Sequence, residues 1–380
     1  MYIKRNLENV IKKQLFKGKV IIIYGPRQAG KTTLVKKILE PYMAESRYID
    51  CELLENRTLF QNRNSTELFA LVDGYKVIVL DEAQTVPEIG SILKSLIDHR
   101  PDIQYIATGS SSFDLANSVS EPLTGRSLEY TLYPMDMTEL YDKAFDIENN
   151  IDNIMRYGFY PGIIGTEEEK IKRLSMLTNQ YLYKNVLAVG GIKKPDLIVK
   201  LLKLLAHQIG QEVSIREISK ALETSVQTIE KYIDLLEKNY IIIRLSAYSN
   251  NMRREVTRHQ KIYFVDIGIR NILIENMKRM DITERDDVGA VFENLAILER
   301  LKYISHTDKS MIHQYFWRMS NGAEIDYIES NTDQLIACEF KWNVEAKVKM
   351  PRSFMELYPN AKFNKISKDN LYKFVLSPDL

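Results

Sequence analysis

A glycine-bounded segment near the N-terminus has the residue types and the spacing of a phosphate-binding loop. Four residues separate Gly25 from Gly30, and Lys31 and Thr32 follow at once. Glycines let the backbone turn tightly, so that successive N–H groups converge on an anion. In this pattern the lysine reaches the β- and γ-phosphates of a nucleotide, and the hydroxyl holds Mg²⁺. The expected nucleotide-binding residues are Gly25, Pro26, Arg27, Gln28, Ala29, Gly30, Lys31, Thr32 and Thr33.

The elements that must position this loop are also present in the sequence. Residues 20–23 are four consecutive apolar residues, which is typical of a buried parallel strand. A helix is predicted from residue 31 to residue 39, and it must end before Pro41. The N-terminus of that helix adds positive potential at the anion site. An ordinary glycine-rich turn is the alternative, and the strand and helix on either side argue against it.

A second buried strand ends in two acidic residues. Residues 77–80 are apolar, and Asp81 and Glu82 follow them. Ligands of doubly wound sheets bind beyond the carboxyl ends of the parallel strands. Asp81 is therefore expected to hold Mg²⁺ directly or through water, and Glu82 to polarise the attacking water as general base. An acidic strand end is common by itself, but the phosphate loop upstream favours the catalytic interpretation.

Two further positions could complete such a site. A third predicted strand, at residues 104–110, ends with Thr108 and Ser110, which could sense the γ-phosphate or position the water. The alternative there is a simple Gly-Ser turn. Arg126 follows a glycine turn, and its guanidinium could stabilise transition-state charge at the γ-phosphate of its own chain or of a neighbour. The alternative for Arg126 is an ordinary surface arginine.

These motifs together resemble a known family. The segments GPRQAGKTTL, VIVLDEAQ, ATGSS and LTGR, followed by residues 133–140, look like the uncharacterised prokaryotic AAA-type ATPases. In that family the ATPase domain precedes a C-terminal domain of unknown function, and the resemblance spans nearly the whole chain. It implies an α/β P-loop domain with a doubly wound parallel sheet that uses ATP and Mg²⁺. It does not supply a biological substrate.

Composition limits the remaining possibilities. A chain of 380 residues predicts two or three domains. The 52 basic and 51 acidic residues leave a net charge of +1, so global charge does not favour nucleic acid or membrane. The two cysteines, Cys51 and Cys338, form no disulfide framework, which fits a reducing cytoplasm. No apolar run approaches the roughly 18–20 residues of a membrane span, so no membrane partner is expected.

Three domains are predicted along the chain. The AAA-type ATPase domain is expected at residues 1–145, where an acidic stretch marks the boundary. A helical connector and a winged helix follow at 146–255, and a nuclease-like α/β domain occupies 256–380. Within the second segment, the capping residues Ser214 and Thr224 open two helices, and residues 240–245 would form the wing strand.

A winged helix suggests a nucleic-acid reader, but its charges are mixed. Glu230 and Asp234 lie on the expected exposed face of the second helix, where acids would repel phosphate. The nearest basic cluster lies just beyond the wing and comprises Arg253, Arg254, Arg258 and Lys261. Double-stranded DNA is thus one expected partner, and a packing or oligomerisation module is the alternative.

The C-terminal third carries a second constellation of polar residues. Glu293 lies on a predicted helix, Asp326 on a strand, and Glu339 and Lys341 on the next strand. Alternate residues of a strand share a face, so Glu339 and Lys341 point the same way and Asp326 could meet Glu339. Such carboxylates could hold a divalent metal while the lysine positions or activates water at a phosphodiester.

This order of residues resembles the restriction-endonuclease-like nuclease core. Ile325 stands where the fuller motif has proline, and a solvated strand face is the alternative. The leading hypothesis for the whole chain is an ATP-driven switch acting on nucleic acid. An ATP-gated metal-dependent DNA nuclease and a signalling or scaffold ATPase with protein partners are the rivals. Homo-oligomerisation stays open in each case.

Overall fold

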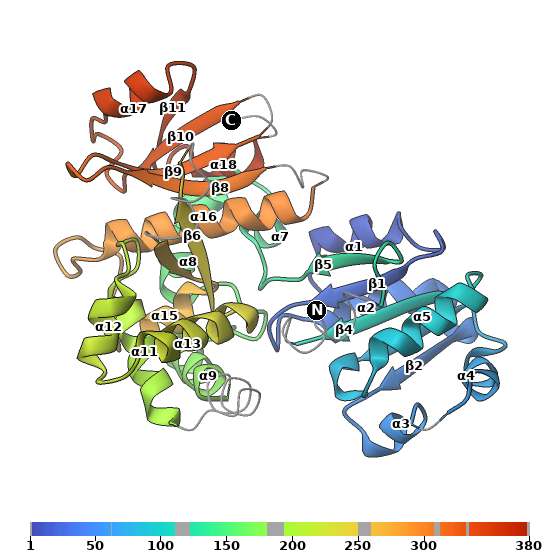
Figure 1. Ribbon diagram of the computed structural model, residues 1–380. Helices are drawn as coiled ribbons and strands as arrows, with labels where there is room; N and C mark the ends of the chain where they lie inside the picture. The colour runs from blue at the N-terminus through green and yellow to red at the C-terminus, as the bar shows by residue number, and fades with distance from the viewer. Residues whose placement is uncertain are drawn as a thin grey trace. The chain divides into compact units, whose positions relative to one another are not determined.

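The computed structural model describes residues 2–61, 63–110, 122–180, 194–249, 260–307, 312–331 and 334–377. The chain forms two compact units (Figure 1). The first comprises Met1–Met135 with Lys238–Tyr240, and the second comprises Asp136–Glu237 with Ile241–Leu380. Within the described ranges, no helix is both long and apolar enough to cross a bilayer.

The first unit is built on a five-stranded parallel sheet with strand order β2-β3-β4-β1-β5. Its strands are β1 (Val20–Tyr24), β2 (Ser46–Asp50), β3 (Val77–Asp81), β4 (Gln104–Gly109) and β5 (Ser127–Thr131). Its helices are α1 (Asn6–Lys12), α2 (Lys31–Leu39), η1 (Glu40–Glu45), α3 (Leu54–Thr58), α4 (Ser65–Val72), η2 (Ala83–Thr85) and α5 (Ile89–His99). The predicted α/β fold with a parallel sheet is confirmed.

Both faces of this sheet are buried. Val20 and Ile22 of β1 pack in one core cluster with residues of α4 and α5, whereas Ile21 and Ile23 pack in another with residues of α1 and α2 (Figure 1). Because consecutive strand residues point to opposite faces, a continuous apolar run is what a strand covered on both sides requires. The sheet is thus a rigid frame whose carboxyl edge presents the polar residues.

The second unit contains a group of helices and a six-stranded mixed sheet with strand order β11-β10-β9-β8-β6-β7. The helices are α7 (Met137–Leu140), α8 (Ala144–Tyr157), α9 (Glu167–Gln180), α11 (Pro195–His207), α12 (Ile215–Ala221), α13 (Val226–Lys238), α15 (Ile267–Leu273), α16 (Val288–Ser305), α17 (Arg352–Leu357) and α18 (Leu371–Leu376). The strands are β6 (Ile242–Ala247), β7 (Gln260–Phe264), β8 (His313–Arg318), β9 (Glu324–Ser330), β10 (Leu335–Phe340) and β11 (Lys362–Ile366).

Helix α16 is tied to this sheet by buried polar contacts. The side-chain amide of Asn294 donates to the carbonyl of Phe264 and accepts from its N–H, at 2.9 Å each, so it caps the edge strand β7. The guanidinium of Arg300 forms two hydrogen bonds with the Glu329 carboxylate on β9, at 2.6 and 2.9 Å. A buried group of this kind must be paired, because an isolated one costs several kcal/mol.

The second unit includes both the helical part and the C-terminal part of the chain. The boundary predicted near residue 255 falls between β6 and β7, which pair with each other in antiparallel fashion. Strand β6, which was expected to be the wing strand, also pairs in parallel with β8 of the C-terminal sheet. The helix pair α12 and α13 is present, but it belongs to one compact unit with the C-terminal strands. The two compact units change over at residues 135 and 136, near the boundary expected at 145.

Candidate functional site

The loop between β1 and α2 has the backbone that its glycines predict. Gly25 has φ 148°, and Gly30 has φ 98° at the N-cap of α2. A Cβ added to Gly25 would lie 2.1 Å from the carbonyl oxygen of Leu132, so no side chain fits there. Gln28 also adopts a left-handed conformation, with φ 61°. This is a nest-like backbone suited to an anion.

Lys31, the first residue of α2, is held inside this loop. Its ammonium donates to the carbonyl oxygens of Gly25 at 2.8 Å and Pro26 at 3.1 Å. It also lies 3.9 Å from the Glu82 carboxylate and is only 5% exposed. Burial lowers the pKa of Lys31, and the charges of Glu82 and Asp81 oppose that effect. The ammonium is therefore fixed between the loop and the carboxyl end of β3.

Asp81 is the centre of a hydrogen-bond network at the end of β3. One carboxylate oxygen accepts from the Thr32 hydroxyl at 2.8 Å and from the hydroxyl of Tyr48 on β2. The other accepts from the hydroxyl of Thr108 on β4. Asp81 is 5% exposed, so these contacts replace the solvation that the carboxylate loses. The structure thus brings Thr32 and Asp81, the two expected metal ligands, into direct contact.

Glu82 has an unusual backbone at the site. Its φ of 52° and ψ of 46° are left-handed, which costs about 1 kcal/mol or more for a residue with a side chain. Its N–H donates to the Thr108 hydroxyl at 3.1 Å, so Thr108 contacts both acids. Its carboxylate accepts from the Gln84 amide at 2.6 Å, and the same amide donates to the Ser110 hydroxyl at 3.2 Å. These bonds fix the direction of the Glu82 side chain.

Three residues of this site were not predicted from the sequence. Tyr48 contacts Asp81, Gln84 contacts Glu82, and Arg5 donates to the carbonyl oxygens of Ala29 at 2.6 Å and Tyr133 at 2.7 Å. Of these three residues, only Gln84 could have been predicted from the sequence, because it lies two residues after Glu82. Tyr48 reaches Asp81 from the neighbouring strand, and Arg5 reaches the loop from before α1.

Arg126 is not part of the site of its own chain. Its backbone carbonyl accepts from the N–H of Val20, which places it at the amino edge of the sheet, opposite the loop. Its guanidinium contacts the exposed Asp98 at 2.6 Å. The structure does not bring Arg126 to the phosphate loop of its own chain, and its action on a nucleotide stays a prediction. Arg27, at the tip of the loop, pairs with Glu52 at 3.3 Å.

The C-terminal carboxylates meet around Lys261, a cation that was expected to belong to a basic surface. The Lys261 ammonium lies 3.2 Å from Glu293, 2.5 Å from Glu324 and 3.9 Å from Asp326. Glu339 is paired with Lys341 at 2.8 Å. No group of three or more potential metal ligands is arranged to hold a metal ion within the described parts of the chain. The carboxylates that were expected to bind a metal are thus paired with lysines instead.

Burial controls the electrostatics of this lysine-centred cluster. It raises the pKa of Glu293 to about 7, although the charge of Lys261 opposes the shift. It also raises the pKa of Asp326 and, together with the Asp326 charge, that of Glu339. Buried carboxylates that lie close together can all ionise only at a large cost in free energy, unless a buried cation compensates their charge.

The same lysine removes part of the expected nucleic-acid surface. Lys261 is 1% exposed, so its ammonium is not available to a phosphate backbone. Arg253, Arg254 and Arg258 lie outside the described residues. The repulsion expected from Asp234 on α13 is reduced, because Arg244 pairs with it at 2.7 Å, and Glu230 remains exposed.

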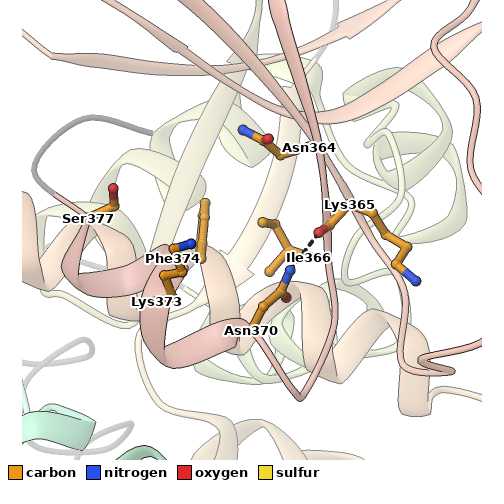
Figure 2. Close-up of a pocket in the computed structure, with 7 residues that line it drawn as sticks. All are labelled: Asn364, Lys365, Ile366, Asn370, Lys373, Phe374 and Ser377. Atoms are coloured by element: carbon orange, nitrogen blue, oxygen red, sulfur yellow. Dashed lines mark hydrogen bonds between the residues drawn. The ribbon is translucent and has the colours of Figure 1, made fainter.

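A separate pocket of about 310 Å³ lies between β11 and α18 of the second unit (Figure 2). Figure 2 shows the Asn370 amide bonded to the backbone carbonyl of Lys365, at 2.9 Å. The Lys365 ammonium donates to the carbonyl of Val344 at 2.5 Å. Because these polar groups are already paired and no expected site residue lines the pocket, it is not a candidate for the chemistry described above.

The parallel sheet, the loop and the acidic end of β3 define the first unit as a P-loop nucleotide-binding domain. Residues 17–141 match the family model described as an AAA domain. Residues 148–280 and 288–376 match two families described as domains of unknown function, DUF8612 and DUF4143. Three successive parts of the chain thus match an AAA-domain model and two families of unknown function.

Three proteins with similar sequences are described only as uncharacterised. Proteins of Mycobacterium bovis and Mycobacterium tuberculosis are each 26% identical over 332 residues, which cover 86% of this chain and 71% of theirs. A Haemophilus influenzae protein is 24% identical over 297 residues, which cover 75% of this chain and 70% of its own length. The aligned lengths exceed that of the AAA match, and the descriptions of these proteins name no activity.

Similar solved structures include Pif1 helicases. The Candida albicans Pif1 helicase shows 16% identity and a TM-score of 0.27, with 47% of this chain and 48% of that chain covered. Unliganded Pif1 from a Bacteroides species shows 12% identity and a TM-score of 0.24, with 48% and 52% covered. The chain thus spans about half the length of these proteins.

Proposed function

We propose that this chain is a Mg²⁺-dependent ATPase. The observation that carries the proposal is the 2.8 Å hydrogen bond between the Thr32 hydroxyl and the Asp81 carboxylate. It joins the phosphate loop to the acidic end of β3 at the edge where ligands of such sheets bind. The AAA family match over residues 17–141 supports the same assignment.

The oxygen donors fit a magnesium ion. Mg²⁺ prefers hydroxyl and carboxylate oxygens and usually keeps several waters, so Thr32 and Asp81 are sufficient protein ligands. The metal would neutralise charge on the phosphates during transfer. Tyr48 and Thr108 hold the Asp81 carboxylate from either side and thereby orient the oxygens that face Thr32.

The remaining residues have separate roles. Lys31 is buried at the loop with its ammonium ready to contact β- and γ-phosphate oxygens. Glu82 would polarise the attacking water, and Gln84 and Thr108 hold its side chain and backbone in place. A buried, preorganised arrangement of this kind stabilises developing charge without reorganisation at the moment of reaction.

Steady-state ATP turnover with Mg²⁺ tests the proposal. Lys31→Ala should abolish turnover, and Thr32→Ala should lower it and raise the Mg²⁺ concentration required. Lys94→Ala is the matched control, because Lys94 is an exposed lysine on α5 of the same unit. Equal turnover in Lys31→Ala and Lys94→Ala would refute the assignment.

We further propose that the nucleotide cycle drives a switch on nucleic acid. The helices α12 and α13, which follow each other along the chain, support this interpretation, and so does the pairing of Asp234 with Arg244, which reduces one source of repulsion. Neutralised phosphates release counterions, so DNA affinity should fall linearly on a log–log plot against salt. Turnover stimulated by double-stranded DNA with such a slope is the expected result. Turnover indifferent to DNA would move the search to protein partners.

A further inference from the structure

We infer that Lys261 serves as the built-in cation of the C-terminal carboxylate cluster, which closes that cluster to divalent metal. The region would then be an ion-pair core and not a metal-dependent nuclease centre. This inference is independent of ATP hydrolysis, because every residue involved lies in the second unit. It opposes the ATP-gated nuclease hypothesis.

The position of the Lys261 ammonium is the first argument. It lies 2.5 Å from Glu324, 3.2 Å from Glu293 and 3.9 Å from Asp326, where a metal shared by these residues would have to sit. The lysine is 1% exposed, so water does not screen its charge. A divalent ion at this point would be strongly repelled by a buried ammonium.

The carboxylate oxygens are also committed to other donors. The Tyr263 hydroxyl donates to the same Glu293 oxygen that faces Lys261, at 2.5 Å. The backbone N–H of Phe340 donates to Asp326 at 2.9 Å, and the Lys341 ammonium donates to Glu339 at 2.8 Å. A magnesium or manganese ion needs near-octahedral oxygen ligands. Each expected ligand therefore already shares its oxygens with a hydrogen-bond donor, in addition to facing a lysine ammonium.

Lys261 is anchored so that it cannot easily withdraw. The backbone of Lys261 lies in β7, opposite Leu245 of β6. It also forms an isolated antiparallel β-bridge with the backbone of Glu212. Its ammonium lies 5.5 Å from the centre of the Phe316 ring. Moving the ammonium away would leave three partly buried carboxylates without their cation, which is strongly unfavourable.

Nothing in sequence order alone could reveal this arrangement. Lys261 precedes Glu293 by 32 residues and Asp326 by 65 residues. Only the position of β7 at one end of the sheet, beside α16, directs Lys261 and Tyr263 to Glu293. If the cluster is an ion-pair core, the domain contributes to function through contacts and not through phosphodiester cleavage.

Mn²⁺ titration of the nucleotide-free full-length protein tests the inference, with calorimetry and thermal unfolding as readouts. Wild type and Asp326→Asn should bind Mn²⁺ identically, since any weak binding at Asp81 is common to both. Lys261→Met should gain one Mn²⁺ site and a melting temperature that rises with Mn²⁺. The double variant with Asp326→Asn should lose both gains. Lys341→Met is the matched control, because it removes a lysine but leaves Lys261 in place, and it should show no gain.

Two results would overturn the inference. One is Mn²⁺ binding by wild type that Asp326→Asn abolishes, which would mean that the native cluster accepts metal. The other is a folded Lys261→Met protein without any added Mn²⁺ site. If Lys261→Met does not fold, the comparison of wild type with Asp326→Asn still decides the matter, because it requires no change at Lys261.

Discussion

The guanidinium of Arg5 donates a 2.6 Å hydrogen bond to the carbonyl oxygen of Ala29, in the middle of the phosphate loop. The same guanidinium donates to the carbonyl of Tyr133, at 2.7 Å, so a residue from before α1 joins the loop to the segment after β5. Arg5 is 4% exposed. A charged donor buried in this way restricts the loop before any ligand arrives.

Arg5→Ala should therefore weaken nucleotide binding. Hydrogen bonds to charged groups contribute about 1.5–3 kcal/mol, so affinity should fall by roughly tenfold or more if the loop loses its order. Titration with a fluorescent ATP analogue would measure the change. Arg5→Lys, which keeps the charge but not the two-pronged geometry, should be intermediate. Unchanged affinity in Arg5→Ala would show that the loop is ordered without it.

Gly25→Ala should disrupt the loop by a direct collision. The added Cβ would lie 2.1 Å from the Leu132 carbonyl oxygen, so β1 and the segment after β5 must separate. Gly18→Ala is the matched control, because Gly18 has φ 64° but nothing within 4 Å of an added Cβ. We expect Gly25→Ala to lower the melting temperature and remove ATP binding, while Gly18→Ala shows only the smaller cost of its backbone. Similar effects in both variants would contradict the packing argument.

Tyr48→Phe should raise the Mg²⁺ concentration required for ATP turnover more than it changes the maximal rate of turnover. The Tyr48 hydroxyl donates to the Asp81 oxygen that also accepts from Thr32, so its loss leaves that oxygen less firmly oriented. Loss of an outer partner of a metal ligand typically costs about 10–100-fold in metal affinity or activity. The half-saturating Mg²⁺ concentration for ATP turnover should rise accordingly. A lower rate at saturating Mg²⁺ with an unchanged Mg²⁺ requirement would assign Tyr48 another role.

Glu299 should make stability depend on pH. Burial raises the pKa of this α16 carboxyl from 4.5 to about 7, although Lys302 opposes the shift. Because the folded state holds the proton more tightly than the unfolded state, this group's contribution to stability is full below pH 4.5. It is lost as the pH rises to about 7. Glu299→Gln should remove that loss, which is on the order of 3 kcal/mol at 1.36 kcal/mol per pKa unit.

Denaturant unfolding of wild type and Glu299→Gln at several pH values would measure this difference. The free energy of unfolding of wild type should fall relative to the variant between pH 4.5 and 7. The Glu299 carboxylate also accepts from the N–H of Met137 at 2.7 Å, a bond that Gln can keep. A pH-independent difference between the two proteins would mean that Glu299 does not titrate in this range.

The parts of the molecule that could be predicted from sequence are those coded by neighbouring residues. Strands β1 and β3 are short apolar runs with polar residues at one end, so both the parallel sheet and the meeting of Thr32 with Asp81 follow from local pattern and one topological rule. The contact of Tyr48 depends on the order of the strands, and that of Arg5 depends on a hydrogen bond to Tyr133, far away in the sequence. No local sequence pattern predicts either contact.

The surroundings of Lys261 could not be predicted from neighbouring residues either. Its place beside three arginines in the sequence suggested a basic surface, whereas its strand directs the side chain into a buried cluster. Arg126 was likewise assigned from its type and its preceding glycine. The register of β5 with β1 places it at the wrong edge of the sheet. In both cases the residue type indicates a positive charge, but the direction of the side chain depends on the position of the residue in its sheet.

The most direct test of the central claim is single-turnover ATP hydrolysis by wild type and Glu82→Gln with Mg²⁺, measured beside ATP affinity. The left-handed backbone of Glu82 and its bonds to Thr108 and Gln84 hold its carboxylate at the site. The account predicts that Glu82→Gln binds ATP as wild type does but hydrolyses it at least about 100-fold more slowly, in keeping with loss of a general base. Hydrolysis by Glu82→Gln at the wild-type rate would contradict it.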